Sequence, residues 1–178
     1  EDWIRSLAGL SIQNARITVP DLHLEERGPV LFTHEGLSGP AVLRLSAWGA
    51  RPMHEKKYCF PLSVDWIPGQ SMEESRQEMQ SRRQRQGAKT LSRSGWPPLP
   101  SRLWEHLCRS AGITPDERWS KFPREKENLL LRKIHETRLE VVGKSMNKEE
   151  FVTCGGIPLG EVDMKTMESR KVPGLYFA

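Results

Sequence analysis

The sequence lacks the features that mark several large classes of protein. Only three cysteines, Cys59, Cys108 and Cys154, occur in 178 residues, and no CxxC pair or Cys/His ligand spacing accompanies them. This argues against a disulfide framework and against a metal site, so free thiols in a reducing compartment are expected. We expect the cytoplasm, or the plastid stroma in a photosynthetic eukaryote. No apolar run approaches the roughly 20 residues of a membrane helix, and no secretory signal opens the chain, so no membrane partner is expected.

Glycine-rich nucleotide fingerprints are absent as well. Neither GxGxxG nor GxxxxGK[ST] occurs in the chain, which therefore carries no dinucleotide or P-loop cradle of its own. What is present is ordinary for a folded protein, because 37% of the residues are hydrophobic and 28% are charged. The length suits one domain or two small ones.

Hydrophobic spacing divides the chain into three segments. Residues 1–68 contain several stretches with the pattern of strands, for instance Asn14–Val19, which alternates with period two, and Tyr58–Trp66. Residues 69–136 change to a charged helical pattern of about four short helices, the first of which Ser71 can cap. Residues 137–178 return to strand spacing. The sequence predicts an α+β fold, in which a small antiparallel β-barrel-like unit is split by an inserted small helical subdomain.

The last segment is expected to complete the β unit. Arg138–Val142 has the pattern of a strand that pairs with the first third of the chain. Pro158–Arg170 suits a hairpin, and Gly174–Ala178 has the composition of a buried strand. Because Glu1 opens directly into folded-looking sequence and Ala178 ends an apolar run, we expect both ends to continue into a longer polypeptide.

The segment Gly28–Ser46 has the pattern of a strand, a small-residue turn and a helix start. After a turn at 27–29, an apolar run ends in Thr33-His34, and small residues then lead to Pro40 and a helix over about 41–50. Ser38 is expected to cap that helix. Such a junction directs backbone N–H groups and a positive helix end toward whatever lies in front. An ordinary strand-to-helix connection is the alternative interpretation.

Two long stretches together resemble one family. GPVLFTHEGLSGPAVLRLS resembles the GELLFTHxGLSGPAxLxLS segment of the BaiN-like FAD/NAD(P)-dependent oxidoreductases, also described as aminoacetone-oxidase-like flavoproteins. The closing VTCGGIPLGEVDMKTMESRKVPGLYFA resembles that family's VTxGGVxLxEVdpkTMESklVPGLYFA. The opening WIRSLAGLSIQNARITV matches in order and spacing, so the resemblance covers essentially the whole chain.

The resemblance implies that the complete protein is an oxidoreductase with FAD as cofactor and NAD(P)H as electron donor. In that family an insert interrupts an FAD-binding Rossmann-like domain, and this chain would be the insert plus the return strand into that domain. The implied partners are the FAD-binding domain of the same polypeptide and a small-molecule substrate. The fragment alone is expected to be inactive and not to hold FAD tightly.

The resemblance also nominates site residues on two turns, which we expect to converge at the flavin ring. His34 is the catalytic candidate, because its imidazole could donate a proton or a hydrogen bond to a substrate. Glycines after a strand let a ring approach the backbone closely. A structural cap, for His34, and a bulge or tight turn, for the glycines, are the alternatives. The cofactor-binding residues expected are Thr33, Ser38, Gly39, Thr153, Gly155 and Gly156.

A nucleic-acid-binding module is the competing interpretation. It rests on a pI of about 9.1, on the basic run Arg82–Arg85 and on the expected small barrel. Against it, 23 acidic residues nearly balance 27 basic ones, and the chain has few Tyr and Phe for stacking on bases, two and five. Arginine-rich helix ends are usually solvated faces, so a nucleic-acid partner is not expected. A protein-interaction module is the third alternative.

Overall fold

The computed structural model describes residues 2–144 and 155–177. Contacts within the chain divide it into two compact units, Glu1–Met146 and Asn147–Ala178. The expected third segment, 137–178, is therefore shared: its first strand belongs to the larger unit, and the residues from 147 onward form the smaller one. Each unit is described by itself.

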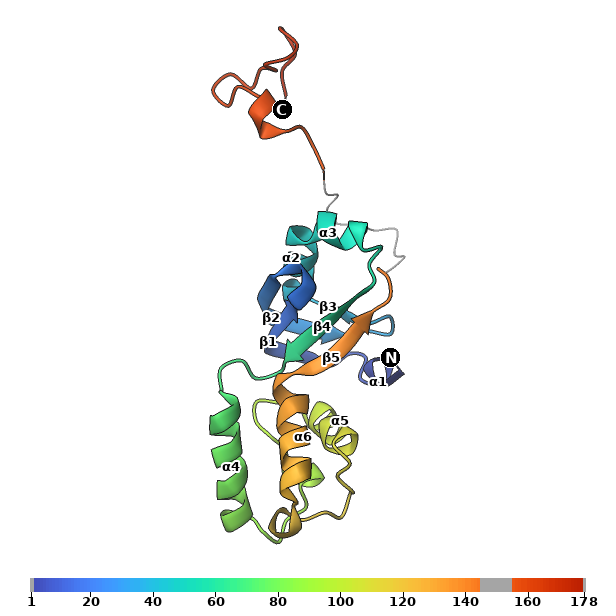
Figure 1. Cartoon of the computed structure of the whole chain (residues 1–178), viewed down its shortest axis with the longest axis vertical. Helices are drawn as coiled ribbons and strands as arrows, with labels where there is room; N and C mark the ends of the chain where they lie inside the picture. Colours follow the sequence, from blue (N-terminus) through green and yellow to red (C-terminus); the bar gives the residue numbers. More distant parts are fainter. Residues whose placement is uncertain (1, 145–154, 178) are drawn as a thin grey trace. The chain divides into compact units, whose positions relative to one another are not determined.

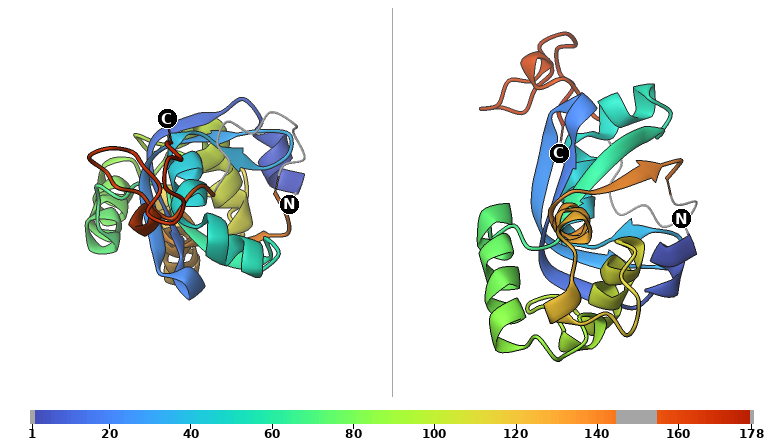
Figure 2. Two further views of the ribbon diagram at one scale, coloured as in Figure 1. Left: turned by 90° about the horizontal axis from the view of Figure 1, so that it is seen from above. Right: turned by 60° about the horizontal axis from the view of Figure 1, so that its bottom comes forward.

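The larger unit is built on a curled five-stranded antiparallel sheet with the strand order β3-β2-β1-β4-β5, a half-barrel that Figure 2 shows from two sides. The last strand pairs with the first third of the chain as expected, because Phe60 lies opposite Val141 and Val64 opposite Thr137. The expected α+β fold with a split β unit is thereby confirmed. The strands are β1 (Ser11–Val19), β2 (Leu24–Phe32), β3 (Leu37–Ser38), β4 (Phe60–Asp65) and β5 (Thr137–Val141).

The turn expected at 27–29 is wrong, because β2 runs through these residues without a break. Ile12 pairs with Val30 and Ala15 with Gly28, so β1 carries one extra residue at this point, a β-bulge. Gly28 has a φ of +153°, a conformation that glycine adopts without strain. A glycine inside a strand often marks such an irregularity, and here it was misread as the end of the strand.

Four short helical segments accompany the sheet: α1 (Asp2–Ser6), the 3₁₀ turn η1 (Pro20–Leu22), α2 (Pro40–Trp48) and α3 (Ala50–Glu55). Pro40 takes the first position of α2 as expected, but the cap residue is Gly39 and not Ser38. The helix expected over 41–50 ends at Trp48 and is followed by Gly49, where a Cβ would come within 2.6 Å of Leu24 and 2.7 Å of Met53. No helix within residues 2–144 and 155–177 has the length and apolar character needed to cross a membrane.

The helical insert leaves the sheet after β4 and returns to it at β5 (Figure 1). Ser71 caps its first helix in a capping box, because Ser71 Oγ accepts from the Glu74 N–H and Glu74 accepts from the Ser71 N–H. The insert consists of α4 (Met72–Arg85), η2 (Ser92–Ser94), α5 (Ser101–Ser110), η3 (Trp119–Lys121) and α6 (Arg124–His135).

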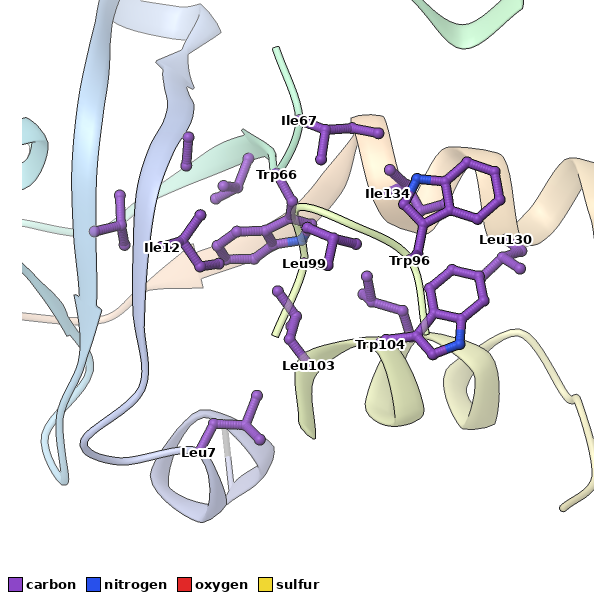
Figure 3. Close-up of a cluster of buried hydrophobic side chains, with 14 of the residues drawn as sticks. Leu7, Ile12, Trp66, Ile67, Trp96, Leu99, Leu103, Trp104, Leu130 and Ile134 are labelled. Atoms are coloured by element: carbon purple, nitrogen blue, oxygen red, sulfur yellow. The ribbon is translucent and has the colours of Figure 1, made fainter. Parts of the chain in front are cut away.

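Sheet and insert share one hydrophobic core. Trp66, which follows β4 and is fully buried, lies among Ile12 of the sheet and Leu99 and Leu103 of the insert in Figure 3. Its ring stacks on Phe32 at 5.5 Å between centroids. Burial of large side chains on both sides of the junction makes the insert a continuation of the same core.

The smaller unit, over residues 155–177, contains little regular structure. It has one 3₁₀ turn, η4 (Leu159–Glu161), and two isolated bridges, Val162 with Ser169 and Glu168 with Tyr176. The hairpin expected over 158–170 is reduced to the first of these bridges. The buried strand expected at its end is wrong, because the Tyr176 side chain is 61% exposed.

Candidate functional site

The first candidate turn joins β2 to β3 and is closed by Thr33. The Thr33 N–H donates to the Gly36 carbonyl at 2.8 Å, and the Thr33 hydroxyl donates to the same oxygen at 3.0 Å. That hydroxyl also accepts from the N–H groups of Glu35 at 3.2 Å and Gly36 at 3.1 Å. Its hydrogen-bonding capacity is thus used inside the turn. The assignment of the Thr33 hydroxyl to a cofactor stays a prediction, and its observed role is to hold this loop.

His34 is exposed on this turn, directly after Thr33. In the described part of the chain its imidazole makes no hydrogen bond, so both ring nitrogens are open to a ligand. The turn is fixed by the Thr33 bonds on one side of His34 and by the pairing of Leu37 with Phe32 on the other. A histidine displayed on an ordered turn can donate or accept a proton toward a group outside this unit.

Gly39 and Ser38 have structural explanations. A Cβ on Gly39 would come within 3.0 Å of the Pro29 carbonyl oxygen and 3.1 Å of the Leu31 nitrogen, and the Gly39 φ of +99° favours glycine. Gly39 is therefore required for α2 to begin directly against β2. Ser38 lies in β3, opposite Leu31. Their assignment to a cofactor stays a prediction.

The second candidate turn belongs to the smaller unit. Gly155 and Gly156 are exposed, with φ of +151° and +118°, and nothing lies within 4 Å of the place where a Cβ would stand on either. This backbone is open to close approach by a flat ligand. Thr153 lies outside the described residues. Since the two turns fall in different units, their expected convergence at a flavin stays a prediction.

A buried polar cluster at the junction of sheet and insert was missed by the sequence reasoning. Asp65, at the end of β4, accepts from Arg16 at 3.0 Å and lies 3.2 Å from Nδ1 of His135, the last residue of α6. The other imidazole nitrogen lies 2.8 Å from the Ser75 hydroxyl of α4. Asp65, Ser75 and His135 are all buried. The position of His135 at the end of an amphipathic helix is the one signal in the sequence that points to this cluster.

The order of this cluster, carboxylate to imidazole to hydroxyl, is that of a nucleophilic triad. Ser75 is, however, fully buried, with an exposed fraction of 0%, so a substrate cannot reach its oxygen. An open groove of about 610 Å³ beside β1, β4 and β5 is lined by Asp65 and His135 but not by Ser75. The cluster therefore joins two parts of the fold and has no access for hydrolysis.

Cysteine and metal chemistry find no support in the described residues. Burial, and then the neighbouring Glu105 carboxylate, raise the pKa of the Cys108 thiol, so this cysteine stays protonated and unreactive. Cys59 is exposed and free. Within residues 2–144 and 155–177, no three His, Cys, Asp or Glu side chains gather in a way that could hold a metal ion.

Comparison with known proteins places the chain in a family. Residues 1–152 match the model described as "HI0933-like protein barrel and H2TH domain". The chain is 32% identical over 169 residues to the "Ribosomal RNA dihydrouridine synthase" of Escherichia coli (strain K12), covering 92% of this chain and 39% of that protein. It is also 32% identical over 148 residues to the protein of the same name from Haemophilus influenzae, covering 83% of this chain and 34% of that protein.

These relatives refine the resemblance drawn from the sequence motifs. The chain spans only a third to two fifths of their length. They are named as an enzyme, in agreement with the class expected, but their name is that of an RNA-modifying synthase and not of a BaiN-like oxidoreductase. The chain belongs to the family of the HI0933-like protein barrel and H2TH domain.

Proposed function

We propose that this chain is the barrel and helical part of a flavin-dependent reductase that converts uridine in ribosomal RNA to dihydrouridine. The observation that carries the proposal is the 32% identity to a ribosomal RNA dihydrouridine synthase across 92% of the chain. A match that covers 92% of the chain must include both candidate turns, whichever residues it begins and ends at. The substrate proposed is thus an RNA base, in place of the small molecule expected from the family resemblance.

The chemistry of the named reaction fits the cofactors expected from the motifs. Forming dihydrouridine adds a hydride to one carbon of the uracil C5–C6 double bond and a proton to the other, and the double bond becomes a single bond. FAD, when bound and reduced by NAD(P)H, supplies a hydride of this kind. The protein must then orient the base and deliver the proton. A cytoplasmic location, which the cysteine usage favours, suits a ribosomal RNA substrate.

The open backbone and the engaged side chains support a different role for each of the two turns. The open backbone at Gly155-Gly156 leaves room for a ring on its surface. At the other turn, Thr33 and Gly39 are engaged within the fold, which leaves His34 as the group able to act outward. We therefore assign close approach of the cofactor to the two glycines, and proton delivery or a hydrogen bond to the base to the His34 imidazole.

The surface of the smaller unit supports a further domain as partner. Among residues 155–177, Val162 is the one buried hydrophobic side chain. A segment with so little core of its own needs another surface to cover its apolar side chains. We propose that the FAD-binding domain of the same polypeptide supplies that surface. The exposed large hydrophobic residues are Ile157, Leu159, Met164, Met167, Val172, Leu175 and Tyr176.

A single-turnover experiment on the complete protein tests the proposed function. The protein is purified with its flavin, reduced without oxygen by NADH or NADPH, and mixed with unmodified ribosomal RNA made by transcription in vitro. The proposal predicts that the flavin absorbance returns on mixing with this RNA and not on mixing with buffer. The proposal would be contradicted by a protein that holds no flavin, or by one whose reduced flavin is not reoxidised when the RNA is added.

A further inference from the structure

The positive charge of the chain is concentrated in the helical insert. Residues 69–136 contain fourteen Lys and Arg against nine Asp and Glu, a net charge of +5. The whole chain carries +4, so the remaining residues together carry −1. The positive net charge of the chain therefore comes from the insert, because the remaining residues together are slightly acidic. Polyanions attracted by net charge are expected at the insert.

Four basic residues lie in the segment that follows α4 and in the segment that leads into the first residue of α6, at the end of the insert that points away from the sheet. Figure 1 shows that the last turn of α4 and the first turn of α6 lie at this end. Backbone contacts hold the connecting segments against each other: the Trp119 N–H donates to the Lys89 carbonyl at 3.1 Å, and Thr90 forms a bridge with Arg118. We call the surface formed by Lys89, Arg118, Lys121 and Arg124 the distal face.

The charges of the distal face are not used within the fold. All four side chains are exposed, and none forms an ion pair or a side-chain hydrogen bond with another residue of the described structure. Neighbouring basic residues differ in this respect. Arg83 is bound to the buried Glu127 at 2.8 Å, and Lys126 to Glu117 at 2.6 Å.

A hollow that includes two residues of the distal face adds other groups able to contact a polyanion. An open hollow of about 680 Å³ is lined by Arg118, Lys121 and Lys126, together with the hydroxyl-bearing Thr114 and Ser120. Asp116 also lines it, and Glu117 lines it while bound to Lys126. Hydroxyls and long cationic side chains are the groups that contact phosphate and sugar oxygens in nucleic-acid complexes.

The aromatic residues of the same segment are turned inward. Trp119 is fully buried and Phe122 is 3% exposed, so neither can stack on a base. Recognition at this surface must then depend on the phosphate backbone and not on base identity. Binding of that kind is strongly weakened by salt.

We propose that the distal face binds the phosphate backbone of the RNA whose uridine is reduced. This inference rests on the proposed function and specifies which surface holds the substrate beyond the reacting base. An RNA held at the distal face gains affinity through release of its counterions, while the base itself is selected elsewhere in the complete protein.

The test uses the complete protein and unmodified ribosomal RNA made by transcription. One variant combines Lys89→Gln, Arg118→Gln, Lys121→Gln and Arg124→Gln. A matched control combines Arg5→Gln, Arg51→Gln, Lys57→Gln and Arg138→Gln, which remove four exposed charges from the sheet side of the same unit. Affinity is measured at several salt concentrations, and flavin content and thermal unfolding confirm that both variants are folded.

The distal-face variant is expected to bind RNA roughly a hundredfold more weakly at low salt, and its log–log salt slope should fall by about 3, as four lost phosphate contacts require. The control should change both quantities much less. Equal losses of RNA affinity in the two variants, or an unchanged salt slope in the distal-face variant, would overturn this inference. Either result would leave the proposed function standing. If the unaltered protein binds no RNA, the proposed function fails and the inference fails with it.

Discussion

Thr33 and His34 are adjacent in the chain, but their side chains differ in the hydrogen-bonding capacity that remains unused. The Thr33 hydroxyl makes three hydrogen bonds inside its own turn, whereas the His34 imidazole makes none in the described structure. A ligand at this turn would therefore form hydrogen bonds with the His34 imidazole more readily than with the Thr33 hydroxyl.

His34→Ala should leave flavin bound, because the proposed contact of His34 is with the RNA base. Loss of a proton donor used in the transition state should slow RNA-dependent reoxidation of the flavin by roughly a hundredfold, with its reduction by NAD(P)H unchanged. Stopped-flow absorbance of both half-reactions, beside flavin content, measures this. Unchanged rates in both would return His34 to a structural role, and loss of flavin would make it a cofactor ligand.

Gly156→Val should weaken flavin binding by the complete protein. The Gly156 φ of +118° disfavours a branched side chain, and the added atoms would occupy the open space beside the backbone. Gly160→Val is the matched control, because Gly160 is also exposed but has no positive φ. Fluorescence titration with FAD measures the two affinities. Equal affinities for the two variants would remove Gly156 from the cofactor site.

The role of a single residue could be predicted from the sequence where that role depends only on residues next to it in the chain. Ser71 was identified as a cap because the capping box needs only residues 71–74. Ser38 was misassigned as a cap because the residue pattern alone does not show that Gly39 must pass within about 3 Å of the β2 backbone. That requirement comes from a neighbouring strand and cannot be read from the turn itself.

At the scale of elements, the start of α4 should respond to acid through Glu74. The hydrogen bond from the Ser71 backbone N–H, and then that from its hydroxyl, hold the pKa of Glu74 below its usual range. A carboxylate whose pKa is lowered by folding stabilises the fold above its unfolded pKa, and this contribution is lost as the pH falls through the folded pKa.

Glu74→Gln keeps a side chain suited to the capping box and removes the titration. The free energy of unfolding of the unaltered protein should therefore exceed that of the variant at neutral pH, and the two should converge in acid. Urea unfolding at a series of pH values measures the difference. Glu73→Gln, in the same turn but outside the box, is the control, and an identical pH response of both variants would contradict the account.

The buried cluster at Asp65 is expected to secure the junction of insert and sheet. Asp65→Ala removes the partner of His135 and of Arg16 and leaves the Ile67 N–H without its acceptor, so it should lower the free energy of unfolding by about 2–4 kcal/mol. Asp116→Ala, at an exposed position, should change it by no more than about 0.5 kcal/mol. Chemical unfolding measures both, and similar small losses would show that the cluster is not a structural joint.

Spacing along the chain predicted the elements better than it predicted their contacts. The change from period two to helical spacing located the insert between β4 and β5, because periodicity is a property of each element alone. The bulge opposite Gly28 and the contact of Ser75 with His135 depend on partners far along the chain, the latter 60 residues away. Such partners leave no periodic signal.

At the scale of the whole molecule, the two units differ in how they are stabilised. The larger unit has a core that runs from the sheet into the insert, whereas residues 155–177 expose most of their large hydrophobic side chains. The smaller unit is therefore the part that we propose the FAD-binding domain covers, and it also carries Gly155 and Gly156. A cofactor domain that covers this unit would bring the flavin to those glycines.

The most direct test of the proposed function is the formation of dihydrouridine in RNA. Unmodified ribosomal RNA is incubated with the complete flavin-loaded protein and NADH or NADPH, digested to nucleosides and analysed by mass spectrometry. The account predicts that a uridine gains the mass of two hydrogen atoms only when protein and NAD(P)H are both present, and that the yield falls steeply with His34→Ala. Uridines left unchanged by a protein that holds flavin and oxidises NAD(P)H would contradict it.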